Sequence, residues 1–410
     1  MEIKMAWRNI WRNARRSVLT ILAILFATML LVFMLSFQFG SYDTMINTAV
    51  KVHTGHVQVQ AREYRDRMDI RLAVPDPGAL GDFIGNIAGI AASTSRANAF
   101  SLVSSRDRTY GVLVTGIDPD GEAAVSTLKQ LVRKGDYLAP GDTDRALVGA
   151  LLARNLKVDI GDELIVLGQG RDGSVAAAAL TVKGIFSSGE DRFDRNSIQM
   201  PLPYFQEVFA MGGAVHEVVI LGRSLEEVAG IKGELEGVVS DMDTDGRLAV
   251  LDWMELMPGL VQSIKLDLFS GLIMYVILIV VVAFSILNTF LMAIFERQRE
   301  FGVVMAIGMT PRRLMQCLFL ESAMITLVGI VLGIVSGSLV TWYFQVHGIL
   351  ISGASEVLSQ FGLPDRLYPQ LSVLSISIGA GIVLVITILT AIYPVIKVRR
   401  LRPVEAMTAV

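Results

Sequence analysis

Residues 269–313 read FSGLIMYVILIVVVAFSILNTFLMAIFERQREFGVVMAIGMTPRR, and this stretch decides the fold. Its first part, Phe269–Phe295, carries no charged residue. A helix of that length, rising about 1.5 Å per residue, crosses a hydrocarbon core of about 30 Å. Gly308 is typical of a helix C-terminus, Thr310 of an N-cap and Pro311 of a first helical position. The stretch predicts two membrane spans joined by a short basic elbow, residues 296–322.

Three further apolar windows have the length of a membrane span. The chain is 52% apolar with a mean hydropathy of +0.54, and these apolar residues are clustered rather than spread evenly. The sequence therefore predicts an α-helical membrane protein with four transmembrane helices, at residues 18–40, 269–295, 323–344 and 371–395. Between and beside them lie the segments 1–17, 41–268, 296–322, 345–370 and 396–410.

The distribution of Lys and Arg predicts the orientation in the membrane. Outside the long segment 41–268, these residues gather in 1–17, in the elbow and in 396–410, whereas 345–370 holds only Arg366. Short basic flanks stay cytoplasmic, so both termini and the elbow are predicted to be cytoplasmic. The long segment and 345–370 then lie on the opposite side. Because that side carries a net negative charge, nucleic acid is excluded as a partner.

The N-terminal segment predicts an amphipathic helix. Trp7, Ile10 and Trp11 share one side, and Arg8 and Arg12 lie on the other, which is typical of a helix in the membrane interface. The alternative is a basic flank that only orients the first span. That span is predicted to be a retained anchor, since its apolar core is longer than that of a signal peptide.

Segment 41–268 is predicted to be an α+β domain with two lobes, because it is too long and too patterned to be a loop. Alternating or apolar runs predict strands at 56–60, 101–105, 110–117, 164–167, 180–186, 215–221 and 248–251. Helical patterns lie at 146–155, 225–235 and 253–265. A single cysteine, Cys317, leaves no internal disulfide.

Two motifs in this domain resemble ligand sites. Gly168–Gly173 matches G-x-G-x-x-G, but a strand-like run follows it where a nucleotide site needs a helix, so a β-hairpin with an Asp-Gly turn is predicted. Asp241–Asp252 has the Asp, Asp, Asp and Gly spacing of a calcium loop but ends in Asp instead of Glu. A solvated acidic turn is the simpler interpretation, and no metal site is predicted. No Walker A, H-E-x-x-H or G-x-S-x-G pattern occurs, so no catalytic residue is predicted.

Helix packing and the elbow give the remaining candidate residues. Gly329, Gly333 and Gly337 form a doubled G-x-x-x-G that predicts close helix packing in the third span. In the elbow, Phe301, either Val304 or Met305, and Ile307 give a short helix at about 297–307 an apolar side. That side could lie on lipid, or it could seat in a groove of a cytoplasmic partner.

The sequence resembles the FtsX-like, MacB-type permeases of ABC transporters. The resemblance is carried by Glu296-Arg-Gln-Arg-Glu-Phe-Gly-Val-Val-Met-Ala-Ile-Gly308, by the Trp7-Arg-Asn opening and by the closing Tyr393-Pro and Arg402-Pro-Val-Glu-Ala406. Residues 146–162 resemble the MacB-like periplasmic core. Thr54-Gly-His-Val-Gln58 and the four-span layout are similar to the lipoprotein-releasing (LolC/LolE-like) branch.

The resemblance implies a type VII ABC permease of the bacterial inner membrane, with its large domain in the periplasm. It implies a separate cytoplasmic ATPase that binds ATP and magnesium, a second permease copy or paralogue, and a periplasmic lipoprotein carrier or adaptor. This chain itself is then not an enzyme and holds no cofactor. The elbow residues expected to contact the ATPase are Arg297, Glu300, Phe301, Gly302, Met305, Ala306 and Gly308.

Three functions remain open at this point. The first is extraction of lipoproteins or similar lipidated cargo, through an apolar cleft lined by Met29, Phe33, Met34, Phe37, Met274 and Phe284. The second is MacB-like mechanotransmission, with substrates handled outside the membrane together with an outer-membrane duct. The third is an FtsX-like regulator that switches a cell-wall hydrolase and transports nothing.

Overall fold

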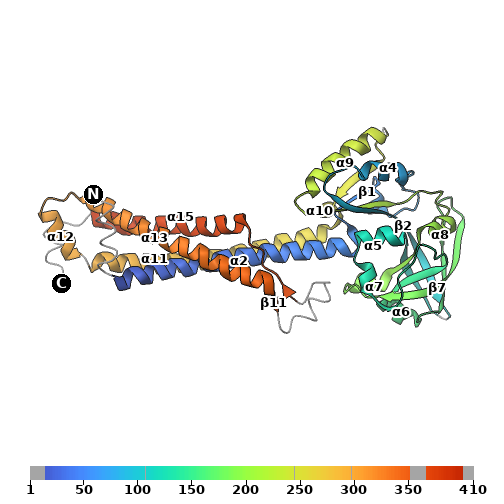
Figure 1. Ribbon diagram of the computed structural model, residues 1–410, viewed down its shortest axis with the longest axis horizontal. Coiled ribbons are helices and arrows are strands. Elements are labelled where there is room, and N and C mark those ends of the chain that lie inside the picture. The colour runs from blue at the N-terminus through green and yellow to red at the C-terminus, as the bar shows by residue number, and fades with distance from the viewer. Residues whose placement is uncertain (1–13, 107, 244, 297, 351–365, 400–410) are drawn as a thin grey trace. The chain divides into compact units, whose positions relative to one another are not determined.

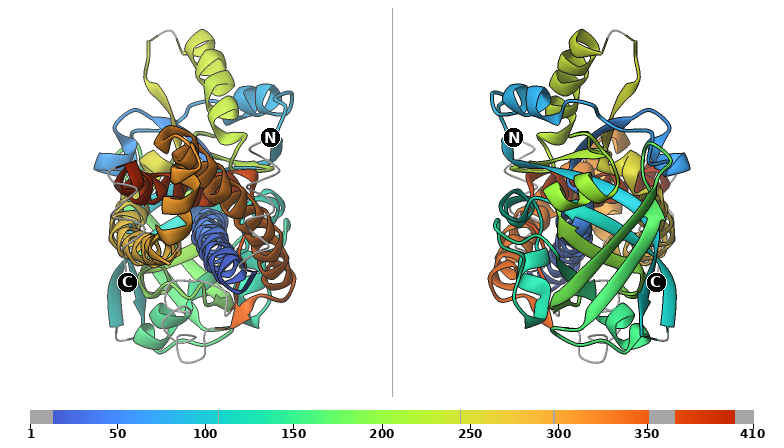
Figure 2. Two further views of the ribbon diagram at one scale, coloured as in Figure 1. Left: turned by 90° about the vertical axis from the view of Figure 1, so that its left-hand side faces the viewer. Right: turned by 90° about the vertical axis from the view of Figure 1, so that its right-hand side faces the viewer.

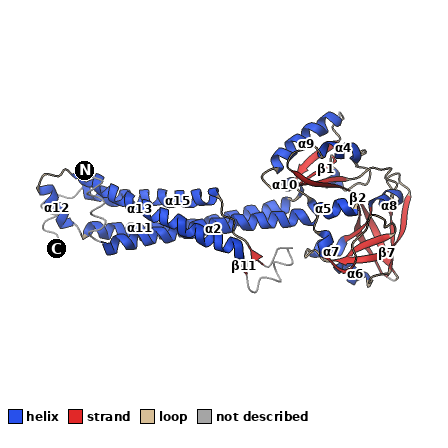
Figure 3. Ribbon diagram, viewed as in Figure 1, coloured by secondary structure: helices blue, strands red, loops and turns tan. Residues whose placement is uncertain are grey.

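The computed structural model describes residues 14–106, 108–243, 245–296, 298–350 and 366–399. The described residues form two compact units: unit 1, from residues 14–43, 264–350 and 366–399, and unit 2, from residues 44–263. Figure 3 shows that unit 1 is almost entirely helical and that the large sheet belongs to unit 2. Residues 5–13 of the amphipathic helix predicted at 5–16, Arg297 and the end of the tail lie outside the described residues.

Unit 1 is built from four long helices (Figures 1 and 2): α2 Ala14–Ala49, α11 Pro258–Phe295, α13 Pro311–His347 and α15 Val373–Arg399. Each is long and apolar enough to cross a membrane. Many large apolar side chains point outward, among them Leu272, Ile277 and Leu389. In lipid such side chains face acyl chains, and the helical backbone satisfies its own polar groups. A short β-pair, β11 Ile349–Leu350 with β12 Arg366–Leu367, follows α13 and precedes α15.

Small residues hold α2 against α13. Gly329, Gly333 and Gly337 are the closest points, because a Cβ added to them would lie 2.8 Å from Ile24 Cβ, 2.5 Å from Thr28 Cβ and 3.1 Å from Met29 Cα, respectively. On the neighbouring side of α2, Ser36 and Ser375 of α15 form a buried hydrogen bond of 2.9 Å. The glycine stripe therefore lets two backbones approach where lipid gives no hydrophobic drive for association.

Unit 2 contains a ten-stranded mixed sheet in the order β10-β1-β9-β2-β3-β8-β5-β7-β4, with β6 paired to β2 and β7. Its strands are β1 Val57–Ala61, β2 Ile90–Ser105, β3 Arg108–Ile117, β4 Val132–Gly135, β5 Arg145–Gly149, β6 Glu163–Gln169, β7 Val175–Phe186, β8 Ser197–Pro201, β9 Glu217–Gly222 and β10 Leu248–Asp252. The helices include η1 Val50–Thr54, α3 Tyr64–Arg67, α4 Pro77–Ile84, α5 Pro119–Val125, α6 Ala150–Leu156, α7 Asp191–Asn196, α8 Leu202–Val208, α9 Val228–Met242 and α10 Trp253–Leu256.

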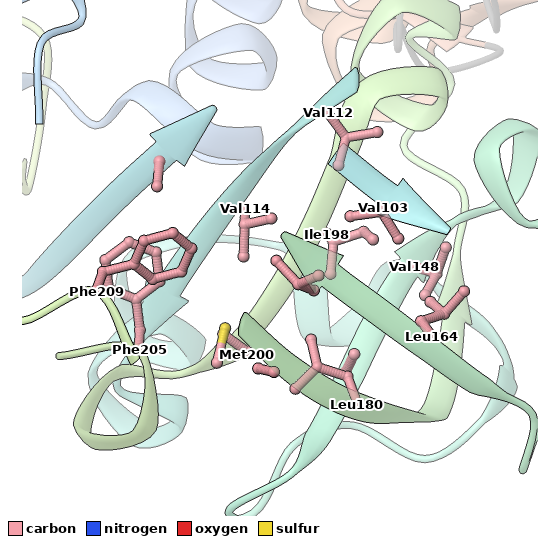
Figure 4. Packing of buried hydrophobic residues seen from close by; sticks show 14 of the residues in the cluster. Val103, Val112, Val114, Val148, Leu164, Leu180, Ile198, Met200, Phe205 and Phe209 are labelled. Atoms are coloured by element: carbon pink, nitrogen blue, oxygen red, sulfur yellow. The ribbon is translucent and has the colours of Figure 1, made fainter. Parts of the chain in front are cut away.

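The two largest apolar clusters of unit 2 lie on this sheet. The larger one joins Val114, Leu180 and Ile198 of the sheet to Phe205 of α8 and to residues of α6, and Figure 4 shows how its side chains gather between these elements. The smaller one joins β1, β9 and β10 to α4 and α9. The smaller cluster includes the second lobe predicted at about 215–250 but also β1 and α4, and a single sheet runs through both clusters.

Most strand predictions in unit 2 are confirmed, and one helix prediction is partly wrong. Residues 146–155 form the buried strand β5 first and only then α6, because Ala146, Leu147 and Val148 sit inside the sheet between β7 and β8. Gly168–Gly173 forms the predicted hairpin turn between β6 and β7, with Gly173 at φ +89° and its N–H bonded to the Gly170 carbonyl at 2.9 Å. The predicted strand before Trp253 is β10.

The glycine contact predicts a sharp difference between two equally small substitutions. Gly333→Ala forces a methyl group against Thr28 and the Leu25 carbonyl oxygen, and overpacking of this kind costs about 1–3 kcal/mol. Gly381→Ala in α15 meets open space and is expected to leave the unfolding temperature unchanged or slightly raised. Thermal unfolding of the two variants in detergent measures this, and equal melting temperatures would contradict the packing.

Candidate functional site

The elbow contains a short helix, α12 Gln298–Ala306, that stops sharply before α13. Gly308 adopts φ +106°, a conformation that glycine reaches without strain. The Gly308 N–H donates to the Met305 carbonyl at 3.1 Å, and the Met309 N–H donates to the Val304 carbonyl at 3.2 Å. These bonds satisfy the last carbonyls of α12. Thr310 occupies the predicted N-cap position before Pro311, but its side chain makes no capping bond.

One side of α12 is buried within the elbow. Phe301 is 3% exposed and Met305 is 9% exposed, and both pack with Leu314 and Leu318 of α13. Among the predicted contact residues, Gly302 is also buried, whereas Glu300, Ala306 and Gly308 are exposed. The buried pair therefore fixes the direction in which α12 presents its other side.

The exposed side of α12 differs from the apolar side predicted from the sequence. Ile307 is 82% exposed and Val303 is 49% exposed. Grouping Ile307 with Phe301 was wrong, because six residues at 3.6 per turn place it about 120° around the helix. Glu300, Val303 and Ile307 form one stripe at spacings of three and four, which we name the elbow stripe. Val303 was missed, although its i, i+4 relation to Ile307 is visible in the sequence.

A cavity of about 520 Å³ lies between α2 and α11 within unit 1. It is lined by Met34, Phe37 and Met274 of the predicted cleft, together with polar residues. Phe33 points elsewhere, with its ring 5.7 Å from that of Phe344 in α13. Met29 lies where α2 meets Gly337, and Phe284 is 68% exposed. The structure thus brings three of the six predicted residues together.

A chain of side-chain hydrogen bonds crosses this cavity. Tyr42 Oη donates to Asp267 Oδ2 at 2.5 Å, Gln38 Nε2 donates to Tyr42 Oη at 2.9 Å, and Tyr275 Oη donates to Gln38 Oε1 at 2.9 Å. We name these four residues the polar bridge. It could not be predicted from the sequence, because Tyr42 and Asp267, and likewise Gln38 and Tyr275, are more than two hundred residues apart in the chain. It links α2 to α11 by polar contacts, in contrast to the tight packing of α2 on α13.

In unit 2, the end of the first long helix is bound by the sheet domain. Helix α2 continues into η1, and Arg96 of β2 donates from Nη1 to the His53 carbonyl there. The Thr127 N–H donates to the Lys51 carbonyl at 2.8 Å, and Gln58 Nε2 donates to the Thr54 carbonyl at 2.6 Å. Carbonyls at a helix C-terminus lack partners within the helix, so unit 2 supplies them. We name this set of contacts the joint.

Arg96 is held by a buried ion pair. Both Arg96 and Glu122 of α5 have no exposed side-chain surface, and Arg96 Nε and Nη2 each donate to a Glu122 oxygen at 2.7 Å. Burial lowers the pKa of Arg96, but Glu122 more than offsets this and the pKa is raised overall. The guanidinium is therefore charged at the negative end of the helix dipole, where a cation is stabilising.

Two titratable groups next to the joint are shifted toward their neutral forms. Burial raises the pKa of Glu217, an effect that Arg96 partly opposes. Burial lowers the pKa of His216 to about 4. His216 Nδ1 accepts from the Asn98 N–H at 2.8 Å, so Nε2 carries the proton and donates to the Ile70 carbonyl at 3.0 Å. The buried ion pair of this cluster is that of Arg96 with Glu122.

Comparison with known protein families agrees with this architecture. Residues 17–238, more than half of the chain, match the model of the MacB-like periplasmic core domain, and residues 272–403 match that of the FtsX-like permease C-terminal region. The chain is an FtsX-like permease with a MacB-like periplasmic core domain. It is a type VII ABC permease with four spans, and its extracytoplasmic domain lies between the first two.

Named relatives are distant. The permease is 26% identical over 316 residues to the lipoprotein-releasing system transmembrane protein LolC of Xylella fastidiosa, covering 73% of this chain and 74% of LolC. It is 22% identical over 422 residues to the uncharacterized ABC transporter permease YknZ of Bacillus subtilis, covering 99% and 98% of the two chains. The solved periplasmic region of MacB from Actinobacillus actinomycetemcomitans aligns at 12% identity with a TM-score of 0.39, over 52% of this chain and 94% of that one.

Membership in this family defines the general role of the chain. An FtsX-like permease is the membrane subunit of an ABC transporter and works with an ATPase. The elbow, the cavity between α2 and α11 and the joint are therefore three candidate parts of one permease.

The joint predicts a large effect of one buried substitution. Arg96→Met leaves Glu122 ionised and unpaired and frees the His53 carbonyl, which is expected to cost about 3–5 kcal/mol. Removing both charges in Arg96→Met/Glu122→Met is expected to recover part of that loss. Chemical unfolding of the full-length permease in detergent measures both variants.

The exposed ion pair of Lys134 and Asp159 provides the matched control, because Lys134→Met should leave the unfolding curve unchanged. An Arg96→Met permease that unfolds like the wild type would show that the joint is not a buried charge pair.

Proposed function

We propose that this permease extracts lipoproteins or similar lipidated molecules from the outer leaflet of a bacterial inner membrane, driven by a cytoplasmic ATPase. The observation that carries the proposal is the cavity between α2 and α11, which has an apolar wall of Met34, Phe37 and Met274 beside the polar bridge. The named likeness to LolC supports the same conclusion. Both termini and the elbow are then cytoplasmic, and unit 2 is periplasmic.

The energetics of acyl chains explain why an apolar cavity is needed. Moving one methylene from lipid into water costs about 0.8 kcal/mol, so a chain of about 16 carbons costs about 12 kcal/mol. If the acyl chain instead moves from lipid into an apolar cavity between helices, most of this cost is avoided. Methionine suits such a site, because its flexible and polarizable side chain conforms to different shapes. The polar bridge then lies where the amide or glycerol end of a lipidated cysteine would emerge.

The elbow stripe is the proposed ATPase contact. Phe301 and Met305 anchor α12 on α13, so that Glu300, Val303 and Ile307 project away from the permease. An apolar pair as exposed as Val303 and Ile307 is typical of a site that a partner covers. Movement of the ATPase would reach the membrane through α13. Helix α2, which packs on α13 and continues into η1, would pass the movement on to the joint. A second permease copy or paralogue and a periplasmic carrier or adaptor complete the proposed assembly.

Substitutions on the two sides of α12 are expected to separate coupling from folding. Val303→Asp and Ile307→Asp should lower cargo-stimulated ATP hydrolysis by the partner about tenfold, as expected for losing the burial of one large apolar side chain. Their melting temperature should stay that of the wild type, and Ile307→Leu should couple normally. Phe301→Asp should instead lower the melting temperature, because it places a charge inside the elbow. ATPase assays and thermal unfolding in nanodiscs measure both.

Normal ATPase recruitment and cargo release by Ile307→Asp would end the coupling proposal. The result leaves the cargo proposal standing, since the cavity between α2 and α11 is tested separately.

Photo-crosslinking tests the cargo. A crosslinker at Met274, which lines the cavity, should capture acylated protein during turnover, whereas one at Phe284, which is on the same helix but not in the lining, should capture lipid only. Mass spectrometry of the adducts identifies what was captured. Capture of lipid alone at both positions would favour mechanotransmission with substrates handled outside the membrane.

A further inference from the structure

A second cavity lies wholly within unit 2 and has no part in the proposed function. It measures about 720 Å³, within the range of about 300–1,000 Å³ typical of ligand sites. It opens between the start of α4, the end of α9 and the adjoining ends of β1 and β10. Its floor is apolar and belongs to the smaller core cluster, through Val74, Leu80 and Val239.

The carboxylates around this cavity are all engaged locally. Asp76 Oδ1 accepts from the Ala79 N–H at the start of α4, and Asp243 Oδ2 accepts from the Leu248 N–H at 2.5 Å. Asp245 pairs with Arg247, and Glu63 pairs with Arg67 at 3.2 Å. Asp243 and Asp245 belong to the segment that resembles a calcium loop, and within the described chain no group of three possible metal ligands occurs. Glu63 and Asp245 are thus paired with arginines, whereas Asp76 and Asp243 keep their charge and accept from backbone N–H groups.

Three guanidinium groups around the same cavity keep free donors. Arg62, after β1, and Arg71, before Val74, are exposed and have no side-chain partner among the described residues. Arg171, in the β6–β7 turn, gives one bond from Nη1 to the Met211 carbonyl at 3.1 Å. Because a guanidinium has five N–H donors, Arg171 retains most of its capacity. If the Glu63–Arg67 and Asp245–Arg247 pairs are taken as neutral, these three positive charges face the two negative charges of the capping carboxylates Asp76 and Asp243.

We propose that this cavity binds an acidic peptide segment that carries an apolar anchor side chain. The anchor would rest on Val74, Leu80 and Val239, and carboxylates beside it would bind the three arginines. Arginine suits this role because its planar fork can bind a carboxylate with two parallel hydrogen bonds. The arginines come from three separate segments around the rim, which suits several charges spaced along a peptide better than one compact headgroup.

This site goes beyond lipid extraction, because its ligand need not be acylated. It gives unit 2 a way to hold the polypeptide part of a cargo or of an extracytoplasmic partner. Its failure would leave the cavity between α2 and α11 and the elbow stripe untouched, since neither shares a residue with it.

Fluorescence anisotropy with the full-length permease in nanodiscs tests the proposal. The probe is a fluorescein-labelled peptide of alternating Glu and Leu, and the matched probe has Gln in place of every Glu. The acidic probe should bind, and raising the salt concentration should weaken it, because exposed charges are screened. Arg71→Gln and Arg62→Gln should each weaken binding about tenfold, the effect of losing one charge-assisted hydrogen bond.

Two further variants separate the contribution of the arginine charges to binding from that of the apolar floor. Arg154→Gln removes an exposed arginine of α6 outside the cavity and should bind the acidic probe like the wild type. Ala79→Trp keeps every charge but fills the cavity, and it should abolish binding of the same probe. Equal affinity for the acidic and Gln probes, or unchanged binding by Arg71→Gln, would overturn the proposal. So would displacement of the acidic probe by dodecyl phosphate alone, which would identify the site as one for a small amphiphile.

Discussion

The structure depends on how the first membrane helix ends. A long helix leaves its last carbonyls without partners, and inside a folded domain such groups need hydrogen bonds from elsewhere. Here the domain provides an arginine side chain, a backbone N–H and a glutamine side chain to three of them. Because Arg96 also belongs to a central strand of the sheet, the joint ties the end of the helix to the sheet within unit 2.

The contacts of α2 within the membrane unit differ in kind. Toward α13, three glycines bring the backbones together with no space for even a methyl group. Toward α11, the contact includes a cavity crossed by the polar bridge. Separating tightly packed helices loses many dispersion contacts, whereas exchanging a few hydrogen bonds for those of an entering polar group costs little. Of these two contacts, the one between α2 and α11 therefore costs less to open.

The sequence predicted what local patterns encode and missed what the tertiary structure brings together. The four spans, the β6–β7 hairpin and the glycine turn of the elbow each depend on hydropathy or residue type over a short stretch, and these were predicted. Arg96 looked like an ordinary charge in a strand, because Glu122 and His53 approach it only after the sheet has formed. The same is true of the polar bridge and of the arginines around the α4–α9 cavity. The error at Ile307 has a simple cause. The predicted apolar side included a residue that lies about 120° around the helix from Phe301, and that follows the last residue of α12.

Stability alone does not explain why Arg96 and Glu122 are buried as an ion pair. Taking two charges out of water costs several kcal/mol each, and an apolar pair of similar size is often as stable or more so. An apolar pair could not bind the His53 carbonyl, however, so it would fill the same space without fixing the helix end. A guanidinium can give two donors to Glu122 and a further one to the helix, which makes one side chain both the charged partner of a carboxylate and the cap of a helix end. The ion pair therefore makes a contact that an apolar pair cannot make, and it contributes to the specificity of the joint more than to its stability.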